Sequence, residues 1–395
     1  MKKTVVILLV LFTVFSGFAG GAAEKGGKAT LGGPIKIGSI QDLSGGASTA
    51  GQPNAWGAEY AVKILNEKGG IQGRMVEITT MDCKNDAAEG VTSYRKLVDE
   101  IGVVAIIGPP LSNPAAAWVE MSEEDQIPIV GHFMDEVCTT DPETGKPYPY
   151  MFLAEPSSAI QSYCMAEFAL KKLGAKSAAT LYNPGNAFAK SQAAPFVDYM
   201  QKNGGRIVTE QTFSWADKDY SAQAIRIVAA NPDVVFLCDY LPQNVTSYDA
   251  LRDAGFKGPI IGANTLSLPF ANMVKNPVKE VYFLQNYDML NPNVGNFYEL
   301  VSLHMKETNT ASPAANVGFG WDAVQVLAAA MEKASDPTDG KEVAALLSKT
   351  SGVMLSSGST ITIDAATHRP NNMGMYIADY DANKNLRIVD YIEVN

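Results

Sequence analysis

The residues that point most directly to chemistry lie at positions 108–114, where the sequence reads Gly-Pro-Pro-Leu-Ser-Asn-Pro. This stretch follows the apolar run 103–107 and precedes a segment with helical periodicity, so it predicts a strand-to-helix junction. Proline is favoured at the first position of a helix, which makes Asn113 the expected N-cap and leaves the Ser112 hydroxyl and the first backbone N–H groups free. These groups and the helix dipole favour a carboxylate or phosphate oxygen. An ordinary capped turn has the same residues, so the interpretation depends on the rest of the chain.

Polar and aromatic residues also follow the other predicted strands. Ligands of open α/β sheets bind where the carboxyl ends of parallel strands meet. Taken together, these residues predict a cleft with hydrogen-bonding groups on one side and aromatic walls on the other, which suits a small ligand with polar and apolar parts. They are Ser44, Ser112, Asn113 and residues 132–135 in the first half of the chain, and residues 182–188, Asp239, Tyr240, Asn264 and Thr265 in the second.

Groups for catalysis are scarce. The chain has three histidines, His132, His304 and His368, and no GxSxG or HExxH motif surrounds them. No Gly-rich loop ends in the Gly-Lys-Ser/Thr of a phosphate-binding loop. We therefore expect no enzyme activity, no cofactor and no metal site. His304 falls in a predicted helix, where we expect it at the surface.

The four cysteines are Cys83, Cys138, Cys164 and Cys238, widely spaced and without a CxxC pair, so a metal site is not expected from them. Cys164 falls within a predicted helix and Cys238 ends an apolar strand, which predicts two buried core thiols. Cys83 and Cys138 fall in the same half of the chain. In an exported protein they could form a disulfide, and the sequence leaves that open.

The first 23 residues have the pattern of a secretory signal peptide. Lys2 and Lys3 precede the apolar run 5–18, and small residues follow up to Ala23. The apolar run is short for a membrane span, and no later stretch approaches about 20 uninterrupted apolar residues. We therefore expect a cleaved signal peptide over 1–23, a flexible leader over 24–34 and a soluble mature chain.

Length and alternating patterns predict the fold class. A chain of 395 residues with 46% hydrophobic and 18% charged residues is expected to form two soluble domains. Short apolar runs alternate with helical periodicity, which predicts α/β architecture with two Rossmann-like lobes, each a mostly parallel sheet flanked by helices. A tail with two helices and three short strands is expected to complete both sheets and to make a multi-strand hinge. The formal net charge of −11 disfavours nucleic acid as a partner.

This ordered series of motifs resembles the leucine/isoleucine/valine-binding proteins, which are solute-binding subunits of ABC importers with the type I periplasmic binding fold. The resemblance spans essentially the whole mature chain. It implies that lobe 1 comprises residues 35–153 and 286–366 and that lobe 2 comprises 154–285 and 367–395. The residues that carry it are 35–38, 42–45, Trp56-Gly57-Ala58, 66–74, Asp82 and Ile107-Gly108-Pro109.

The resemblance also implies roles for individual residues. Ser112 corresponds to the serine that bonds the ligand carboxylate, beside Asn113 of the predicted cradle. Phe133 falls where a backbone carbonyl contacts the ligand amine. Phe188 and Tyr240 match the aromatic residues of the second lobe that close over the ligand.

Two positions depart from the family pattern. Asn264 replaces an acid that pairs with the ammonium of branched-chain amino acids, and a buried ammonium without a partner is unfavourable by several kcal/mol. Asp135 stands where the family often has a threonine that contacts the carboxylate, and it could restore the lost charge from the opposite lobe. Alternatively, the ligand has no ammonium and Asp135 bonds an amide or a hydroxyl group.

The function implied by the resemblance is periplasmic capture of a branched-chain or other neutral amino acid by lobe closure, followed by delivery to an ABC permease in the membrane. We expect a monomer. The alternative ligand is a small aromatic acid or an amide. The alternative role is a ligand sensor of the same fold, which the export pattern and the lack of a DNA-binding motif disfavour.

Overall fold

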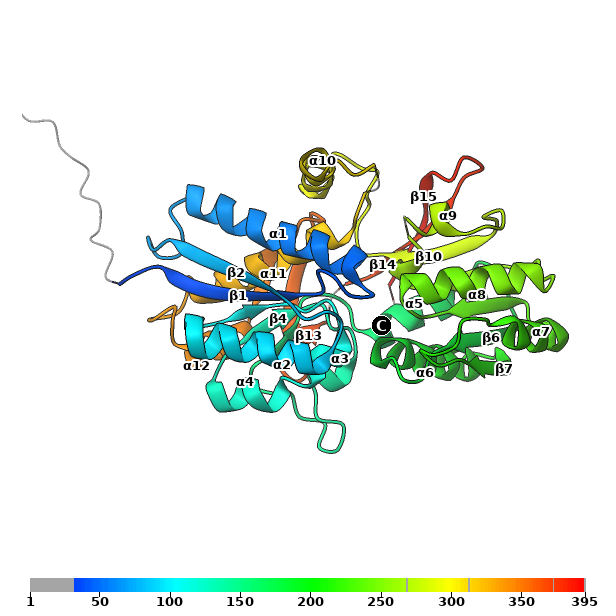
Figure 1. The fold of residues 1–395 in the computed structure, drawn as a ribbon, viewed down its shortest axis with the longest axis horizontal. Coiled ribbons are helices and arrows are strands. Elements are labelled where there is room, and N and C mark those ends of the chain that lie inside the picture. The colour runs from blue at the N-terminus through cyan, green and yellow to red at the C-terminus, as the bar shows by residue number, and fades with distance from the viewer. Residues whose placement is uncertain (1–31, 268, 312, 372, 394–395) are drawn as a thin grey trace, which may run out of the picture. The chain divides into compact units, whose positions relative to one another are not determined.

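Five parallel strands form the first sheet, in the order β2-β1-β3-β4-β5 (Figure 1). The computed structural model describes residues 32–393 apart from 268, 312 and 372, so the predicted signal peptide and most of the predicted leader lie outside the described residues. Because side chains alternate between the faces of a strand, Ile107 and Val130 join one core while Ile106 and Ile129 join another. The strands are β1 (Ile35–Gln41), β2 (Val76–Asp82), β3 (Ile106–Ile107), β4 (Ile129–Gly131) and β5 (Met151–Leu153).

Helices cover both faces of the first sheet. α1 and α11 share a core with one face, and α2 and α4 share a core with the other. The segment of helical periodicity that follows residues 108–114 forms two short helices, α3 and α4. The elements are α1 (Ser48–Glu67), α2 (Ala87–Arg95) continuing as the π-helical turn η1 (Lys96–Ile101), α3 (Ser112–Ala116), α4 (Val119–Asp125), the 3₁₀ turn η2 (Glu136–Cys138) and α11 (Asn316–Met331).

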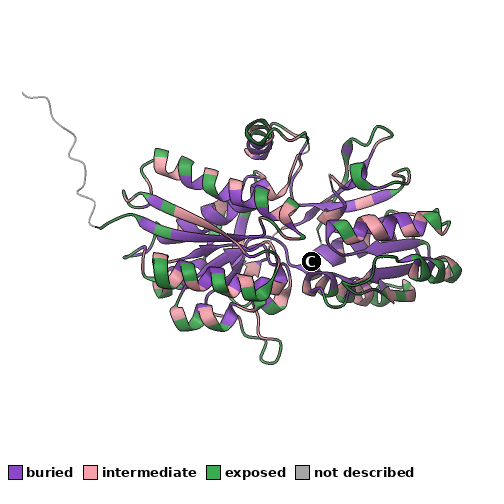
Figure 2. Ribbon diagram, in the orientation of Figure 1, coloured by how far each residue is buried: buried purple, intermediate pink, exposed green. Residues whose placement is uncertain are grey.

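Seven strands form the second sheet, in the order β15-β14-β10-β9-β8-β6-β7, with β14 and β15 antiparallel to their neighbours. The inner strands of this sheet are buried, whereas the two edge strands are largely exposed or half-buried, and the helices turn their buried sides toward the sheet (Figure 2). The strands are β6 (Ser177–Tyr182), β7 (Arg206–Thr212), β8 (Val234–Leu237), β9 (Ile260–Gly262), β10 (Val281–Gln285), β14 (Met375–Tyr380) and β15 (Leu386–Ile392). The helices are α5 (Ser158–Lys171) and α6 (Ala187–Lys202) on one face and α7 (Ser221–Ala230) and α8 (Leu241–Asp253) on the other, with η3 (Asn264–Leu266) and α9 (Phe270–Met273) after β9. The predicted fold class is confirmed.

The chain passes between the two sheets three times, after β5, after β10 and after β13. Between the second and third crossings lie α10, α11 and α12 and a small antiparallel sheet in the order β11-β12-β13. The expectation that the tail completes both sheets is wrong for the first sheet: β14 and β15 extend the second sheet, whereas no described strand of the tail joins the first. The sequence patterns did not indicate α12, β11 or β13. The exact lobe boundaries stay a prediction. Among the described residues, none of the helices combines the length and apolar character that a membrane crossing needs. The bounds are α10 (Phe297–Thr308), α12 (Gly340–Leu347), β11 (Ser351–Met354), β12 (Thr360–Asp364) and β13 (Arg369–Pro370).

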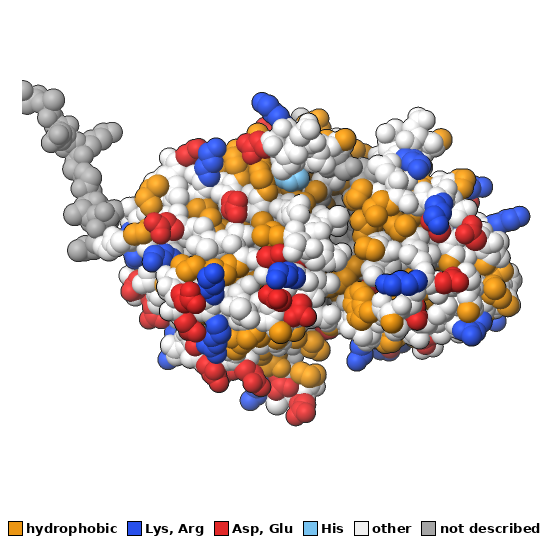
Figure 3. Space-filling view, viewed as in Figure 1, with side chains coloured by type: hydrophobic (Ala, Val, Ile, Leu, Met, Phe, Trp, Pro, Cys, Tyr) orange, Lys and Arg blue, Asp and Glu red, His pale blue; other side chains and the backbone are white. Residues whose placement is uncertain are grey.

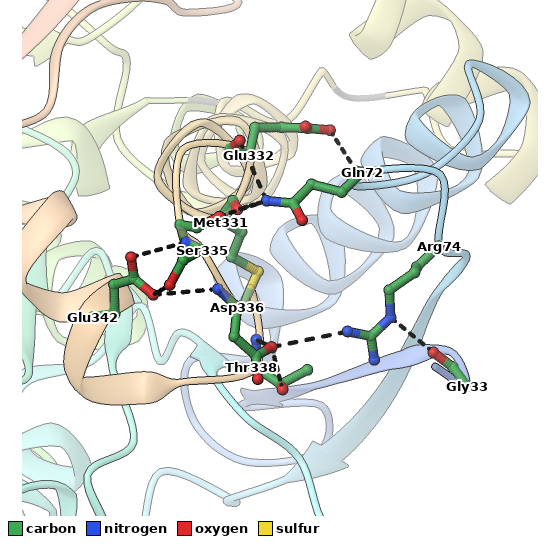
Figure 4. A network of polar contacts seen from close by, with 10 residues as sticks. Gly33, Gln72, Arg74, Met331, Glu332, Ser335, Asp336, Thr338 and Glu342 are labelled. Atoms are coloured by element: carbon green, nitrogen blue, oxygen red, sulfur yellow. Dashed lines mark hydrogen bonds and ion pairs between the residues drawn. The ribbon is translucent and has the colours of Figure 1, made fainter. Parts of the chain in front are cut away.

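The turn after α1 connects the start of the chain to the end of α11 (Figure 4). Gln72 donates its side-chain amide to the carbonyl oxygen of Ala334 at 2.7 Å, and its backbone N–H donates to Glu332 Oε1 at 3.1 Å. Arg74 donates to the carbonyl oxygen of Gly33 at 2.9 Å and faces Asp336 at 4.0 Å. The motif over 66–74 that contributes to the family resemblance is therefore explained by structure alone.

Glycines allow α1 and α11 to approach closely. A Cβ on Gly320 of α11 would lie 1.9 Å from the carbonyl oxygen of Asn54, and a Cβ on Gly57 of α1 would lie 2.0 Å from that of Val317. Both obstacles are backbone atoms, which cannot move without separating the helices. The contact joins residues more than two hundred positions apart.

Gly320→Ala should therefore destabilise the protein although alanine is the better helix former. Overpacking of this kind costs roughly 1–3 kcal/mol, more than the ~1 kcal/mol that alanine gains in helix propensity. Gly33→Ala is the matched control because a Cβ there meets nothing within 4 Å. Urea unfolding of both variants measures the difference, and equal stability of the two would contradict this account of the helix contact.

Asp322 of α11 is a buried carboxylate beside the second crossing. It accepts hydrogen bonds from the backbone N–H of Ser356 at 2.6 Å, the Ser356 hydroxyl at 3.0 Å and the Tyr287 hydroxyl at 2.9 Å. Burial raises its pKa to about 7, and the three hydrogen bonds only partly oppose that shift. The folded chain thus keeps this proton at pH values where the unfolded chain loses it.

We expect the Asp322 carboxyl to make the free energy of unfolding fall as the pH rises from about 4, where it titrates in the unfolded chain, to about 7. Asp322→Asn should remove up to about 4 kcal/mol of this pH dependence, since each pKa unit corresponds to about 1.4 kcal/mol. Urea unfolding at pH 4.5 and pH 7.5 measures it. The exposed Asp99→Asn serves as control, and an unchanged pH profile for Asp322→Asn would refute the assignment.

Candidate functional site

A cavity of about 670 Å³ lies at the carboxyl ends of strands from both sheets. Residues that follow β1, β3, β4 and β5 line it from the first sheet, and the start of α6 and the residues after β8 and β9 line it from the second. Parallel strands end at the same edge of a sheet, which is why these loops meet. The cavity therefore lies where the sequence predicts the cleft.

Four of the seven predicted site residues line this cavity: Ser112, Phe188, Tyr240 and Asn264. The rings of Phe188 and Tyr240 lie nearly parallel with their centres 5.7 Å apart. Both are buried, so they form an aromatic wall with little exposure to solvent. Asn264 begins η3 and is partly exposed.

Asp239 holds the aromatic wall in place. Its carboxylate accepts from the backbone N–H of Tyr240 at 2.8 Å, from the side-chain amide of Asn186 at 2.8 Å and from the backbone N–H of Asn183 at 3.0 Å. Asn186 is the residue directly before α6, the helix that carries Phe188. Burial raises the pKa of Asp239 to about 6 against the effect of these hydrogen bonds. One carboxylate thus fixes the positions of both loops that supply the rings.

The cradle around Ser112 differs from the prediction. α3 begins at Ser112 itself with Leu111 as N-cap, so the N-cap prediction for Asn113 is wrong. Proline is tolerated throughout the first turn of a helix, and Pro114 occupies its third position instead of its first. The Ser112 hydroxyl oxygen accepts from the backbone N–H of Asp135 at 3.2 Å, and its proton remains available to an acceptor in the cavity.

Asn113 points away from the cavity wall toward the second sheet. Its side-chain oxygen accepts from the backbone N–H of Ala187, the first residue of α6, at 3.1 Å. This hydrogen bond joins α3, beside the first sheet, to α6, beside the second. Asn113 therefore holds elements of the two sheets together rather than capping its own helix.

Phe133 and Asp135 are not among the cavity-lining residues. The Phe133 side chain is fully buried in the core around Ile106 and Trp118, which leaves its backbone carbonyl as the predicted contact. The Asp135 carboxylate accepts from the backbone N–H of Val137 at 3.2 Å and caps η2. Its pKa is raised by burial and lowered in part by that hydrogen bond and by nearby basic groups. The expectation that the Asp135 side chain supplies a charge to the ligand is not supported by this geometry.

His132 and Glu155 are buried titratable residues of the cavity; the sequence placed His132 among the cleft residues without a specific role and did not indicate Glu155. His132 follows β4 and stacks on Phe319 with ring centres 4.6 Å apart, and burial lowers its pKa to about 3, so the imidazole is neutral. Glu155 follows β5 and is almost completely buried. An acidic residue directly after the apolar run 151–154 was the signal that could have indicated it. Among the described residues that line the cavity, the acids are Glu59 and Glu155, and there is no lysine or arginine.

Three further expectations concern single side chains. His304 is buried at the edge of the cavity, against Trp56 at 5.2 Å between ring centres, so its predicted surface position is wrong. Cys83 and Cys138 are buried and not bonded to each other, so the disulfide left open by the sequence is not formed. Cys164 and Cys238 are buried as predicted.

The family model for periplasmic binding proteins matches residues 34–385, which is most of the chain. The chain belongs to this family. Its members are solute-binding proteins, not enzymes, of extracytoplasmic compartments. Within the described residues no group of three or more His, Cys, Asp or Glu side chains is placed to hold a metal ion.

Curated relatives point to one branch of this family. A Leu/Ile/Val-binding protein homologue of Brucella melitensis is 27% identical over 234 residues, which cover 59% of this chain and 62% of that protein. The Leu/Ile/Val-binding protein of Escherichia coli K12 is 23% identical over 309 residues, which cover 77% of this chain and 81% of that protein. The chain thus matches somewhat less than two thirds of the first of these relatives.

Solved structures confirm the fold. The branched-chain amino acid transporter substrate-binding protein LivJ of Streptococcus pneumoniae, in complex with isoleucine, superposes with a TM-score of 0.79 at 22% identity over 91% of this chain and all of that one. A solute-binding protein of an ABC transporter from R. palustris, in complex with benzoate, superposes with a TM-score of 0.78 at 20% identity. The superposition covers 91% of this chain and 96% of that one. The predicted resemblance and fold are therefore confirmed, and these two ligands differ in whether they carry an ammonium group.

Asn113→Ala should loosen the connection between α3 and α6. The lost hydrogen bond to the Ala187 N–H contributes about 0.5–1.5 kcal/mol, enough to shift a balanced equilibrium toward a more open arrangement. Small-angle X-ray scattering of the ligand-free protein should show a larger radius of gyration than for the surface variant Asn272→Ala. Identical scattering from both variants would mean that this hydrogen bond does not control the arrangement.

Proposed function

We propose that this protein is an extracytoplasmic solute-binding protein of an ABC importer. It captures a small amino acid, branched-chain or otherwise neutral, and delivers it to the permease in the membrane without chemical change. The observation that carries the proposal is the cavity bounded by strand ends of both sheets, with an aromatic wall on one side and the Ser112 hydroxyl on the other. Cleavage of the signal peptide over 1–23 and export to the periplasm are part of this proposal.

Each face of the cavity suits one part of such a ligand. The Ser112 hydroxyl donates to the carboxylate, and the parallel rings of Phe188 and Tyr240 pack against the apolar side chain. Asn264 supplies amide groups from the second sheet. Micromolar affinity, about 8 kcal/mol, is sufficient for transport and is reachable with these contacts.

Closure of two lobes around the ligand explains why both sheets contribute. We assign lobe 1 to residues 35–153 and 286–366 and lobe 2 to 154–285 and 367–395, joined by the three crossings. A ligand that contacts both lobes stabilises the closed form by as much as its affinity differs between the two forms. The hydrogen bond between Asn113 and Ala187 supports a closed arrangement in the same way.

A small aromatic acid is the less favoured ligand. The described lining residues include no lysine or arginine, so a carboxylate would meet only uncharged hydroxyl, amide, imidazole and backbone donors, with Glu155 buried in the same cavity. An anion without its own positive charge is unfavourable there. A zwitterion brings the missing charge with it.

Mass spectrometry of the compound released on denaturation, together with isothermal titration against neutral amino acids, benzoate and acetamide, tests the proposal. We expect a neutral amino acid to copurify and to bind in the micromolar range. Ser112→Ala should weaken that binding by roughly 1–3 kcal/mol, because the hydroxyl donates to a charged group. Ser302→Ala, exposed on α10, is the matched control. Binding of none of these compounds, or conversion of a bound compound to a product, would refute the proposed function.

A further inference from the structure

Three buried polar residues that line the cavity have hydrogen-bonding atoms without a partner. Within the described part of the chain, no partner exists for Glu155 Oε1, for either ring nitrogen of His132 or for the Tyr240 hydroxyl. Glu155, His132 and Tyr240 are 1%, 2% and 7% exposed. Buried polar atoms are normally paired, so unpaired atoms on residues that line a cavity are available to a bound molecule.

Glu155 differs from the other two because it can carry charge. Its second oxygen, Oε2, accepts from the side-chain amide of Asn286 at 3.0 Å, which orients the carboxylate and leaves Oε1 without a partner among the described residues. No lysine or arginine lines the described cavity wall, and the nearby His132 is neutral. Burial raises the pKa of Glu155 well above its usual range, with the Asn286 hydrogen bond opposing that shift. A buried carboxylate in these surroundings is stable in its charged form only beside a cation.

We propose that Glu155 is the residue that binds the positively charged nitrogen of the ligand, so that the ligand is an α-ammonium carboxylate and not a simple carboxylate or an amide. The inference rests on the proposed function and adds the charge class of the ligand to it. It also names the acid that Asn264 and Asp135 do not provide, since Asn264 is uncharged and the Asp135 carboxylate lies outside the cavity wall.

The position of Glu155 gives the ammonium contact a second effect. Glu155 lies in the first crossing, just after β5, and Asn286 lies in the second crossing, just after β10. The hydrogen bond between them joins two of the three connecting segments. A ligand bound at Oε1 therefore interacts with the hinge itself, while the rings of Phe188 and Tyr240 contact it from the second sheet.

An exposed acid outside the cavity provides a control. Glu77 lies on β2, is exposed and is not among the residues that line the cavity. Removing its charge should therefore have little effect on binding, whereas removing the charge of Glu155 should strongly weaken the binding of a cationic ligand.

The test is isothermal titration of L-leucine and of 4-methylpentanoate, which has the same carbon skeleton and carboxylate without the ammonium, into the wild type, Glu155→Gln and Glu77→Gln. The wild type should bind L-leucine at least about 100-fold more tightly than 4-methylpentanoate, as expected for a buried ion pair. Glu155→Gln should weaken L-leucine binding by at least about 30-fold and leave 4-methylpentanoate binding equal or tighter. Glu77→Gln should change neither by more than about threefold.

Each other outcome is decisive. Equal binding of both compounds by the wild type would overturn the role of Glu155 and leave the proposed function standing. A preference for L-leucine that persists in Glu155→Gln would have the same meaning. If Glu155→Gln does not fold, the wild-type preference and the charge of the copurified compound decide instead. A copurified compound without a cationic nitrogen overturns the inference, and failure of the wild type to bind any neutral amino acid overturns the proposed function as well.

Discussion

The arrangement of this protein depends on three passages of the backbone between two parallel sheets. Because the carboxyl ends of parallel strands collect at one edge, and because the chain leaves the first sheet after β5 and the second after β10, residues from both edges meet around one cavity. The connecting segments are also where Glu155 and Asn286 form their hydrogen bond. In the proposed binding mode, Glu155 belongs both to the binding site and to a segment that connects the two sheets, so that a bound small molecule would influence how the lobes move.

The distribution of charge in the cavity agrees with that arrangement. On the outer face drawn in Figure 3, basic and acidic side chains are interspersed over α1 and α2. The cavity is different, since the described residues of its wall include two acids and no basic side chain. A carboxylate with a partner on one oxygen only is a stronger determinant of ligand type than the apolar lining, because unpaired buried charge is far more unfavourable than imperfect packing.

The sequence predicted the elements better than the contacts. Alternating apolar runs and helical periodicity located nearly every strand, and the positions of Ser112, Phe188, Tyr240 and Asn264 after strand ends placed them in the cleft. Asn113 was misjudged because a proline fits several positions of a first helical turn, and only the tertiary contact with Ala187 selects among them. Glu155 had only a weak signal, an acid directly after an apolar strand, because such an acid is most often solvated; its burial and its hydrogen bond to Asn286 after β10 are tertiary features. The helix α12 was missed although Asp339 caps its start and its apolar residues recur at helical spacing, because its eight residues give a shorter pattern than the longer helices do.

The glycine contact between α1 and α11 has a consequence for biosynthesis. α1, the first helix among the described residues, packs against a helix that ends only at Met331, so a nascent polypeptide lacks this part of its core until most of the translation is complete. Contacts between such distant residues form late, because the intervening chain must first be ordered. A chain that completes its core late stays unfolded for longer during synthesis. An unfolded chain is the form that can pass through a secretion channel.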